Sequence, residues 1–425
     1  MTKRIIILGA GLAGLSCAYH LRRDYDIYEK EFEPGGLCRS NKKDGFVFDY
    51  TGHLLHFKSP YVFNLVKSLL RGNLVSQTRK SWIYSRNTLI PYPFQANIHS
   101  LKKDMAKDCL LGLFGKNNQH VRRGCFYDWM LQKFGPGIVK HFMLPYSLKF
   151  WRRHPKDLTC EWLEGRIPLP SLRDYISGAF EQSDKRWGYN WRFWYPKTGG
   201  ISVLPKSFES KVKKINYNHN VTGIDLKKRL VIFNNSSQAE FSHIVSSIPL
   251  PDLGKIIYPL PQRVREALKK LNYLSVFNLN LGISENGRDK HWIYFPDKDI
   301  IFYRLGFFSS FSSSLAPEGH SSLYTEVSYL KKKPYKGTTG LTERIKKDLV
   351  TVKIIKGMSR ASVVQVNDIK YGYVVYDRDY SKSRKIILEY LQKNNISSVG
   401  RFGSWSYFSM EDSILDGRQA ALLLN

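Results

Sequence analysis

The chain has 425 residues, of which 42% are hydrophobic and 24% are charged, and these are the proportions of a globular protein with about two or three domains. No segment approaches the roughly 18 consecutive apolar residues that a membrane-spanning helix needs, and we expect no signal peptide. The five cysteines lack CxxC spacing, which argues against a disulfide framework and against a metal site. We therefore expect a protein of the reducing cytoplasm.

The net charge of +30 is the unusual feature of the composition. Lysine and arginine are scattered along the whole chain, a pattern that is typical of a basic, solvated surface. A field this positive also attracts anionic small molecules, nucleic acid or an anionic membrane face. Association with nucleic acid or a membrane surface therefore depends on the charge alone, and the sequence does not indicate an oligomeric state.

Residues 4–29 have the pattern of a dinucleotide-binding unit. Apolar residues 5–8 predict a buried parallel strand, and the glycine-rich turn 9–14 follows at once. A helix is predicted from Leu15, and a second strand is predicted at residues 27–28. A glycine turn with this strand before it and this helix after it is the fingerprint of a Rossmann-like fold.

Each position of the fingerprint has a mechanical role. Gly9 allows the tight turn, Gly11 lets the backbone approach a pyrophosphate, and Gly14 lets the helix pack closely on the strand. The helix N-terminus offers unpaired N–H groups to the phosphates. Glu29, twenty residues after Gly9, is placed to accept hydrogen bonds from ribose hydroxyls. We expect these residues of the unit to contact the dinucleotide: Gly9, Gly11, Leu12, Ala13, Gly14, Glu29 and Lys30.

A second glycine turn, residues 34–40, comes just after the ribose acid. Its backbone and Arg39 are placed to return toward a phosphate group or a flavin ring. Together with the first motif, this turn favours FAD over NAD. Its predicted cofactor-binding residues are Gly36, Leu37 and Arg39.

The elements that follow alternate between helical and strand-rich stretches. A strand (45–50), a helix (61–70) and two paired strands (82–84 and 88–93) precede a helical stretch from about 97 to 186. The further predicted strands are 221–225, 230–233, 243–247, 275–282, 291–295, 300–308, 321–329 and 397–402. The further predicted helices are 204–212, 263–271, 342–350, 381–393 and 413–424.

These elements predict an α/β fold with a discontinuous, Rossmann-like FAD-binding domain. We assign residues 1–96, 191–260 and 381–425 to that domain. A helical domain (97–190) and an antiparallel-sheet domain that binds the substrate (261–380) are inserted into it. We expect the active site where the insertions meet the cofactor.

Six segments carry a resemblance to a known family. They are Gly52-His53-Leu54-Leu55-His56, residues 89–94, residues 164–166, residues 190–200, residues 292–297 with Arg304, and residues 400–407. These segments resemble the UDP-galactopyranose mutase family, within the FAD-dependent amine-oxidase-like (protoporphyrinogen oxidase-like) flavoproteins. The resemblance runs, with gaps, over nearly the whole chain. The chain departs from the family pattern at residues 374–375 and 410–413.

The resemblance implies a flavin-dependent sugar-nucleotide mutase. In such enzymes N5 of reduced FAD attacks the anomeric carbon of a UDP-galactopyranose-like substrate, and the pyranose ring contracts to a furanose without net oxidation. NAD(P)H serves only to reduce the flavin, and the product serves cell-surface polysaccharide biosynthesis. Because the cofactor carries this chemistry, the protein has to hold the leaving group, exclude water and position N5.

The resemblance also implies roles for particular residues. Arg166 and Arg304 would bind the substrate diphosphate, which suits guanidinium groups because they bind phosphate oxygens bidentately and stay charged. Tyr294, Tyr373 and Tyr407 would bind the same diphosphate as neutral donors. The implied catalytic residues are His53, Arg166 and Arg304. The further implied cofactor-binding residues are Gly52, His53, Val221, Gly400, Arg401, Tyr407, Asp412 and Ser413.

Each of these side chains also has a structural interpretation. A tyrosine in a strand is more often part of a core, an arginine is usually on a solvated surface, and a loop histidine often only satisfies local hydrogen bonds. The ten-residue spacing between Tyr294 and Arg304 predicts that both lie on neighbouring strands of one hairpin, and this favours function for that pair.

Two other functions stay open. One is an FAD-dependent oxidoreductase of the amine oxidase, protoporphyrinogen oxidase or desaturase type. Such an oxidase would need a more apolar tunnel and would have no need for several phosphate ligands. The other is a non-enzymatic or nucleic-acid-associated flavoprotein, which only the charge supports.

Overall fold

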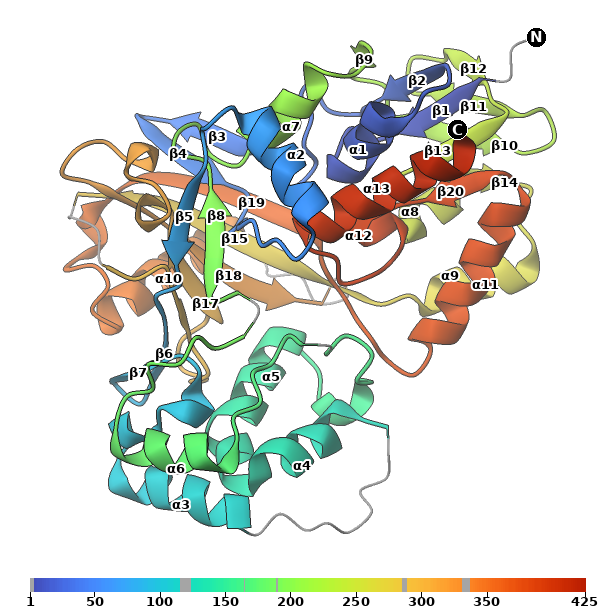
Figure 1. Ribbon diagram of the computed structural model, residues 1–425. Helices are drawn as coiled ribbons and strands as arrows, with labels where there is room; N and C mark the ends of the chain where they lie inside the picture. The colour runs from blue at the N-terminus through green and yellow to red at the C-terminus, as the bar shows by residue number, and fades with distance from the viewer. Residues whose placement is uncertain (1–3, 115–123, 164, 189, 285–288, 331–336) are drawn as a thin grey trace.

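A computed structural model of the chain describes residues 4–114, 124–163, 165–188, 190–284, 289–330 and 337–425. Glu164, within one of the family-like segments, therefore lies outside the described residues. Figure 1 shows a strand-and-helix unit at the top, long strands across the middle, and helices α3 to α6 at the bottom. The predicted fold class is confirmed by this arrangement and by the sheets described below.

The upper unit is built on a five-stranded sheet with the order β20-β13-β1-β2-β9, in which all pairings are parallel. Its strands are β1 (Ile5–Leu8), β2 (Tyr25–Tyr28), β9 (Ile215–Asn216), β13 (His243–Ser246) and β20 (Ile396–Ser398). The central strand β1 is buried along its whole length, as its continuous apolar sequence requires. Because these strands come from three distant stretches of chain, the nucleotide-binding unit is discontinuous.

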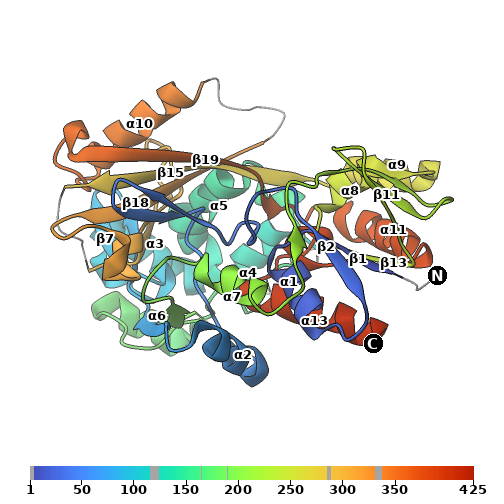
Figure 2. The same cartoon turned by 90° about the horizontal axis from the view of Figure 1, so that it is seen from above.

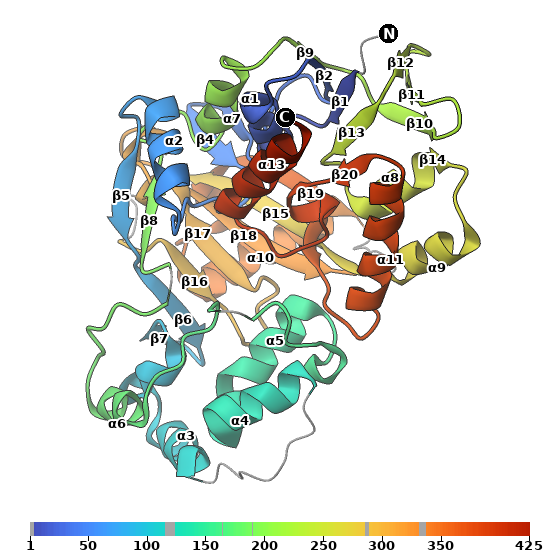
Figure 3. The same cartoon turned by 45° about the vertical axis from the view of Figure 1, so that its right-hand side comes forward.

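The first and the last helix of the chain lie side by side on this sheet, as Figures 1 and 3 show. They are α1 (Leu12–His20) and α13 (Met410–Leu424). A Cβ on Gly417 would lie 2.0 Å from the carbonyl oxygen of Ala13, so this close approach requires glycine. The C-terminal segment is thereby brought to the glycine turn of the N-terminus. Helices α2 (Pro60–Leu70) and α7 (Val203–Glu209) pack beside them.

The predicted strand 397–402 is wrong in its second half. Strand β20 ends at Ser398, and a short helix α12 (Gly400–Gly403) follows. Gly400 has a φ of +79°, which ends the extended conformation, and its N–H donates to the Asp416 carboxylate (2.6 Å) instead of to a strand. Gly400 was the only local signal for this turn in the segment Ser397-Ser398-Val399-Gly400-Arg401-Phe402.

A four-stranded sheet with the order β12-β11-β10-β14 adjoins the parallel sheet. Its strands are β10 (Val221–Asp225), β11 (Leu230–Phe233), β12 (Gln238–Glu240) and β14 (Ile257–Tyr258). The ring of Phe233 stacks on Tyr28 of β2 with 4.4 Å between the centroids, which joins the two sheets. Helices α8 (Leu250–Ile256), α9 (Gln262–Lys270) and α11 (Tyr380–Lys393) pack near this sheet.

The large sheet has seven strands in the order β19-β15-β18-β17-β16-β6-β7. Its strands are β6 (Ser81–Ser85), β7 (Thr88–Pro91), β15 (Tyr273–Ile283), β16 (Trp292–Tyr294), β17 (Arg304–Phe307), β18 (Ser321–Tyr329) and β19 (Ala361–Val374). The predicted hairpin of β6 and β7 is confirmed, and β6 also pairs with β16. This hairpin falls within the predicted FAD-binding stretch 1–96, and the domain limits as a whole stay a prediction.

The two faces of the large sheet differ in character, because successive side chains of a strand point to opposite faces. One face is apolar and packs against α10 (Thr338–Thr351) through residues such as Leu279, Leu323 and Ile345. Figure 2 shows α10 on one side of β15, β18 and β19, with α5 and the nucleotide-binding helix α1 on the other side. The second face carries polar side chains and turns toward the nucleotide-binding unit.

The helical part consists of α3 (Lys103–Phe114), α4 (Phe126–Ile138), a π-helical segment (Val139–Met143), α5 (Leu144–Trp151) and α6 (Leu172–Phe180). Tyr146 of α5 contacts Tyr294 of the large sheet with 5.6 Å between the ring centroids, and Phe150 contacts Tyr373 at 4.7 Å. Helix α5 therefore packs on the polar face of the large sheet. The parallel sheet lies toward the other end of the same face, at the top of Figure 1. None of the described helices is long and apolar enough to cross a membrane.

Two short two-stranded ribbons connect these parts of the molecule, and the buried carboxylate of Asp49 joins the two ribbons. The ribbons are β3 (Ser40–Lys43) with β4 (Phe46–Asp49), and β5 (Val75–Thr78) with β8 (Arg192–Tyr195). Asp49 accepts hydrogen bonds from the hydroxyls of Ser40 (2.6 Å) and Tyr195 (2.7 Å) and from the N–H of Ile201 (3.2 Å).

Asp49 makes the stability of the protein depend on pH. Burial raises the pKa of Asp49 to about 6, although its hydrogen bonds oppose the shift. Because this pKa lies above the ordinary value near 4, the stability that Asp49 contributes is complete below about pH 4 and is lost as the pH rises through about 6. The loss amounts to about 3 kcal/mol at about 1.4 kcal/mol per pKa unit.

We expect Asp49→Asn to remove this loss, because an amide does not ionise. Between about pH 4.5 and 7.5, the free energy of unfolding should change by about 2 kcal/mol in favour of the variant relative to the wild type, because the rest of the loss occurs below about pH 4.5. Urea titrations at several pH values measure this difference. A difference that stays constant across the range would contradict the raised pKa.

Candidate active site

The turn between β1 and α1 leaves no room for side chains at two of its glycines. Gly9 has a φ of +100°, which side chains other than glycine rarely adopt, and its N–H donates to the Tyr28 carbonyl (2.8 Å). A Cβ on Gly14 would lie 1.9 Å from the Gly9 carbonyl oxygen. The turn and the helix can therefore pack in this way only with glycine at both positions.

Gly11 has open space above it instead. A Cβ on Gly11 would meet no heavy atom of the described residues within 4 Å, and no side chain among them caps the N-terminus of α1. The N–H groups of Leu12 and Ala13 thus stand at a helix start that favours an anion. The second glycine turn closes on the same place, since Gly35 N donates to the Ala10 carbonyl (2.8 Å). These residues fit the pyrophosphate of a dinucleotide such as FAD.

Glu29 lies buried at the end of β2, beside this turn. Its carboxylate accepts hydrogen bonds from the N–H groups of Ala10 (2.7 Å) and Glu31 (3.0 Å). Burial raises the pKa of Glu29, and both backbone bonds oppose the shift. Since each carboxylate oxygen has two lone pairs, Glu29 is still able to accept from a ribose hydroxyl.

Two further predicted cofactor residues lie at the Glu29 end. The side chain of Lys30 is 65% exposed and pairs with Glu31 (3.5 Å). Val221 begins β10, two residues after His219, whose N–H donates to the Glu29 carbonyl (2.9 Å). Both residues are remote from the polar face of the large sheet, so any contact they make would be with the nucleotide end of the cofactor.

Arg39 folds back onto its own turn. Its Nε donates to the Gly36 carbonyl (2.8 Å), its guanidinium pairs with Glu31 (3.3 Å), and it lies 4.6 Å from the ring centroid of Tyr50. Gly36 is exposed with a φ of +59°, and Leu37 is partly buried. The charge of Arg39 is therefore engaged within the second turn, and the groups that this turn offers to the space above Gly11 are mainly backbone groups.

The C-terminal residues connect the nucleotide unit to the tyrosines of the large sheet. A Cβ on Gly400 would lie 2.8 Å from the Cβ of Ala13. Arg401 donates to the Phe408 carbonyl (2.6 Å), and its guanidinium lies 5.3 Å from the ring centroid of Tyr373 and 4.5 Å from that of Tyr407. Arg401 is thus placed between the two parts.

The side chains of Asp412 and Ser413 are engaged in the cap of α13. Asp412 accepts from the N–H and the hydroxyl of Ser409 (2.8 Å each), and the Ser413 hydroxyl donates to the Ser409 carbonyl (3.0 Å). The helix begins at Met410, three residues before the predicted start. Their predicted contacts with the cofactor stay a prediction, and they would have to come from the backbone at the start of this helix.

His53 lies on the loop after β4, close to two arginines. A Cβ on Gly52 would lie 2.1 Å from the Tyr324 hydroxyl, so the loop passes directly over that ring. Burial lowers the pKa of His53 to about 4, and the positive charges of Arg401 and Arg304 act in the same direction. The imidazole is therefore neutral at physiological pH.

The polar face of the large sheet holds most of the predicted substrate ligands. Tyr294 and Arg304 lie directly opposite each other on β16 and β17, so the predicted hairpin is confirmed. The strand register continues this row over three more strands. Across the sheet the row reads Tyr294, Arg304, Glu326, Asn278 and Asn367, and the next row reads Trp292, Gly306, Tyr324, Asn280 and Gln365.

Arg304 is paired with Glu326, a residue that was not predicted from the sequence. Nε of Arg304 donates to Oε2 (3.0 Å) and Nη2 to Oε1 (2.6 Å), and the Tyr303 hydroxyl donates to the same carboxylate. Burial opposes the charge of Arg304, but Glu326 and the surrounding tyrosines hold the pKa of Arg304 above its ordinary range. Nη1 has no hydrogen-bond partner in the described part of the chain, which leaves that end of the guanidinium for a phosphate. A signal for Glu326 existed, because it is the one charged residue of strand 321–329.

Tyr373, Tyr407 and two arginines form a second group. The rings of Tyr373 and Tyr407 stack with 5.8 Å between their centroids. The guanidinium of Arg166 lies 4.1 Å from the ring centroid of Tyr407, and that of Arg401 lies at 4.5 Å. Arg166 also donates to the carbonyls of Trp162 (2.9 Å) and Tyr407.

The two groups are within electrostatic reach of each other. Burial raises the pKa of Tyr294 and of Tyr373, and the charge of Arg304 opposes the shift in both. Their phenols therefore stay protonated as hydrogen-bond donors. The structure brings His53, Tyr294, Arg304, Tyr373 and Tyr407 together, whereas Arg166 is held on the outer side of Tyr407.

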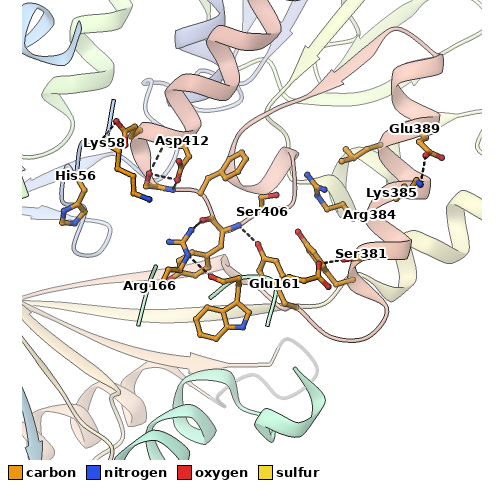
Figure 4. A pocket seen from close by; sticks show the side chains of 18 of the residues that line it. His56, Lys58, Glu161, Arg166, Ser381, Arg384, Lys385, Glu389, Ser406 and Asp412 are labelled. Atoms are coloured by element: carbon orange, nitrogen blue, oxygen red, sulfur yellow. Dashed lines mark hydrogen bonds and ion pairs between the residues drawn. The ribbon is translucent and has the colours of Figure 1, made fainter. Parts of the chain in front are cut away.

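A cleft of about 740 Å³ opens on that outer side (Figure 4). Residues of α11 such as Arg384 line the cleft on one side, with Lys58 and Arg166 across from them (Figure 4), and Tyr407 also lines it. Since Tyr407 lines this cleft and also stacks on Tyr373, it separates the cleft from the polar row of the sheet. Within the described residues, no group of three or more His, Cys, Asp or Glu side chains is placed to hold a metal ion.

Two family models match the chain. The model described as "NAD(P)-binding Rossmann-like domain" matches residues 7–69, and the model described as "Flavin containing amine oxidoreductase" matches residues 125–421. The second match covers more than half of the chain. FAD is therefore the cofactor for the dinucleotide site described above.

Among solved structures, the chain is similar to a reduced UDP-galactopyranose mutase, with a TM-score of 0.94 and 28% sequence identity. That alignment covers 100% of this chain and 95% of the other, and it confirms the family resemblance stated from the sequence. A putative protoporphyrinogen oxidase from Exiguobacterium sp. 255-15 has the same fold, with a TM-score of 0.77 and 14% identity over 100% of this chain and 99% of that one.

A curated relative, coproporphyrinogen III oxidase of Staphylococcus aureus, is 34% identical over 100 residues. This match spans 22% of this chain and 22% of the relative. The chain therefore matches about a fifth of the length of this relative.

Proposed function

Because the chain belongs to the flavin-containing amine oxidoreductase family, we propose that it is a flavin-dependent mutase within that family, with a UDP-galactopyranose-like nucleotide sugar as substrate. The similarity to UDP-galactopyranose mutase over the whole chain carries this proposal. The gathering of Arg304, Tyr294, Tyr373 and Tyr407 supports it, because an anionic diphosphate needs several donors in one place.

FAD would be held by the two glycine turns, Glu29 and the start of α13, and when reduced it supplies N5 as a nucleophile for the anomeric carbon of the sugar. We propose NAD(P)H as the reductant. The residues of the chain then have to stabilise the nucleoside diphosphate as it leaves and returns. No residue has to transfer a proton to this leaving group, because a diphosphate is stable as an anion.

Arg304 is suited to stabilise a leaving group without trapping it. Its charge is balanced by Glu326, so the site gains little net positive charge from this pair. Nη1 of Arg304 and the hydroxyls of Tyr294 and Tyr373 supply directed hydrogen bonds instead. Catalysis needs stronger binding in the transition state than in the ground state. A site that attracts the bound substrate and the departing diphosphate only weakly through net charge therefore does not hold the leaving group too tightly.

Arg166 and Tyr407 would complete the site on the side of the cleft. Arg166 holds Tyr407 through its ring and its carbonyl group, and both residues line the cleft. A substrate that entered from the cleft would meet the Arg166 guanidinium first. We propose that Arg166 binds the diphosphate from this side, where it also helps to exclude water.

The second candidate is an FAD-dependent oxidoreductase. The match to coproporphyrinogen III oxidase favours it, although that match covers 22% of the chain. An oxidase transfers electrons from its substrate to an acceptor in every turnover. The mutase reaction returns the flavin unchanged, so the two functions differ in their consumption of reductant and oxygen.

One experiment separates the two functions. The purified flavoprotein is reduced with NADPH or dithionite under anaerobic conditions and incubated with UDP-galactopyranose and other nucleotide sugars. We expect furanose product only with reduced flavin, and no consumption of reductant in proportion to product. Oxygen uptake in step with substrate loss would overturn the mutase proposal and support the oxidoreductase. We also propose a cytoplasmic location, which the cysteine pattern of the sequence favours, and a role in cell-surface polysaccharide biosynthesis, which follows from the proposed activity.

A further inference from the structure

His53 stands on an arch of backbone, residues 49–59, that is fixed at several points. The Nδ1 atom of His53 is buried and has no hydrogen-bond partner among the described residues. A histidine ring is usually oriented by the partner of one of its nitrogens. The hydrogen-bonding group that acts on the pKa of His53, which it raises against the effect of burial, is the backbone of Thr51, two residues earlier on the arch. The direction of the ring therefore depends on the backbone that carries it.

The beginning of the arch is held by the large sheet. Nδ2 of Asn280, a fully buried residue of β15, donates to the Asp49 carbonyl (3.0 Å) and to Oε1 of Gln365 (2.5 Å). Asn280 lies in the same row of the sheet as Tyr324, whose hydroxyl lies directly under Gly52. The first four residues of the arch therefore rest on one row of the sheet.

The middle of the arch is paired with β8. Leu55 N donates to the Trp194 carbonyl (3.0 Å), and Trp194 N donates to the Leu55 carbonyl (2.8 Å). This bridge follows His53 by two residues. The backbone around His53 is therefore held at Gly52 on one side and at Leu55 on the other.

The end of the arch is held by Glu411 in the first turn of α13. Its carboxylate accepts from the N–H of Lys58 with both oxygens (3.0 Å each) and from the N–H of Ser59 (2.7 Å). Glu411 is only 5% exposed, and hydrogen bonds to a buried carboxylate are strong. Glu411 lies in the segment 410–413, where the sequence departs from the family pattern. The chain thus joins the helix at the cofactor site directly to the arch.

We propose that Asn280 and Glu411 are positioning residues for His53, because they fix the two ends of the arch. The proposal rests on the proposed flavin chemistry, in which the neutral imidazole acts on the bound flavin. Without Glu411 two backbone N–H groups would lose their acceptor, and the second half of the arch would be held mainly by the bridge between Leu55 and Trp194. The loosened bridge would then let His53 change its orientation while the substrate ligands on the large sheet stay in place.

The test compares Glu411→Gln and Glu411→Ala with His53→Ala and with both double variants in the holoenzyme. An amide keeps one acceptor oxygen, so the glutamine variant should be the milder one. We expect Glu411→Ala to lower kcat about 10-fold to 100-fold, with KM for the nucleotide sugar changed less than about twofold. In the His53→Ala background the same substitution should have no further effect on kcat. A loss of equal size in both backgrounds would overturn the proposal.

Asp348→Ala is the matched control. Asp348 is a buried helix carboxylate that accepts from a loop N–H, that of Ile301 (2.7 Å), but it lies on the far face of the large sheet. We expect this variant to lose stability without a change in kcat. If it lowers kcat as Glu411→Ala does, the effect is one of general stability and the positioning role is wrong.

The reduction potential of the bound flavin gives a readout that does not need turnover. Glu411→Ala should shift this potential in the wild-type background and leave it unchanged in the His53→Ala background. A shift that persists without His53 would show a direct effect of the carboxylate charge and would overturn the proposal. Because this measurement requires only bound flavin, it decides the role of Glu411 even if the wild-type protein has no mutase activity.

Discussion

Replacing Arg304 with alanine is expected to lower turnover about a thousandfold while FAD stays bound. The substitution removes the donors that face the diphosphate, and loss of one such donor costs about 100-fold to 1,000-fold. It also leaves Glu326, which is 1% exposed, as an unpaired buried carboxylate in the site of an anionic leaving group. Single-turnover rates of the reduced enzyme and the flavin content of the purified variant measure the two effects.

A double variant separates the two contributions. In Arg304→Ala with Glu326→Gln the repulsive charge is gone, so we expect the rate to recover about tenfold from that of Arg304→Ala alone. Arg344→Ala is the control, because Arg344 also pairs with a buried carboxylate, Asp348 (2.9 Å), but lies on α10. Loss of flavin in Arg304→Ala, or a rate near that of the wild type, would contradict the assigned role of Arg304.

The fold could be predicted from the sequence where its signals are local. The apolar run 5–8, the glycine turn after it and the helix that follows lie within about twenty residues, and each has a fixed geometry. The hairpin 82–93 was recognisable for the same reason, since two apolar runs flank a short polar turn. The helix that begins at Gly400 was not recognisable, because a short segment with one glycine between Val399 and Phe402 is equally consistent with a strand.

The candidate site was predicted only in part, because its partners meet through long-range pairing. The Tyr294–Arg304 spacing is a property of one hairpin, and so it could be predicted. The pairing of Arg304 with Glu326 depends on the register between β17 and β18, and sequence spacing does not determine that register. The bonds from Asn280 and Glu411 to the arch join residues more than two hundred positions apart. The predicted roles of Lys30, Val221 and the other cofactor residues stay predictions.

The glycines of the first turn distinguish the requirements of folding from those of cofactor binding. A Cβ on Gly14 would lie 1.9 Å from the carbonyl oxygen of Gly9, and because the obstacle is the backbone of the turn, no side chain can move to relieve the clash. We therefore expect Gly14→Val to prevent folding of the nucleotide-binding unit, with little soluble protein and no cooperative thermal transition. Because the clash is with backbone, added FAD should not rescue this variant.

Gly11→Val should have the opposite result. Gly11 has a φ of −73°, which any residue adopts, and the space for its Cβ is open in the described structure. The valine side chain would occupy the place where the pyrophosphate has to approach the start of α1. We expect a folded protein whose apo form melts within a few degrees of the wild-type apoprotein, and whose affinity for FAD is lower by at least about 100-fold. Fluorescence titration of both apoproteins with FAD measures this difference. Unchanged affinity in Gly11→Val would mean that the cofactor does not lie over the first turn of α1, and the assignment of the whole site to the glycine turn would then be wrong.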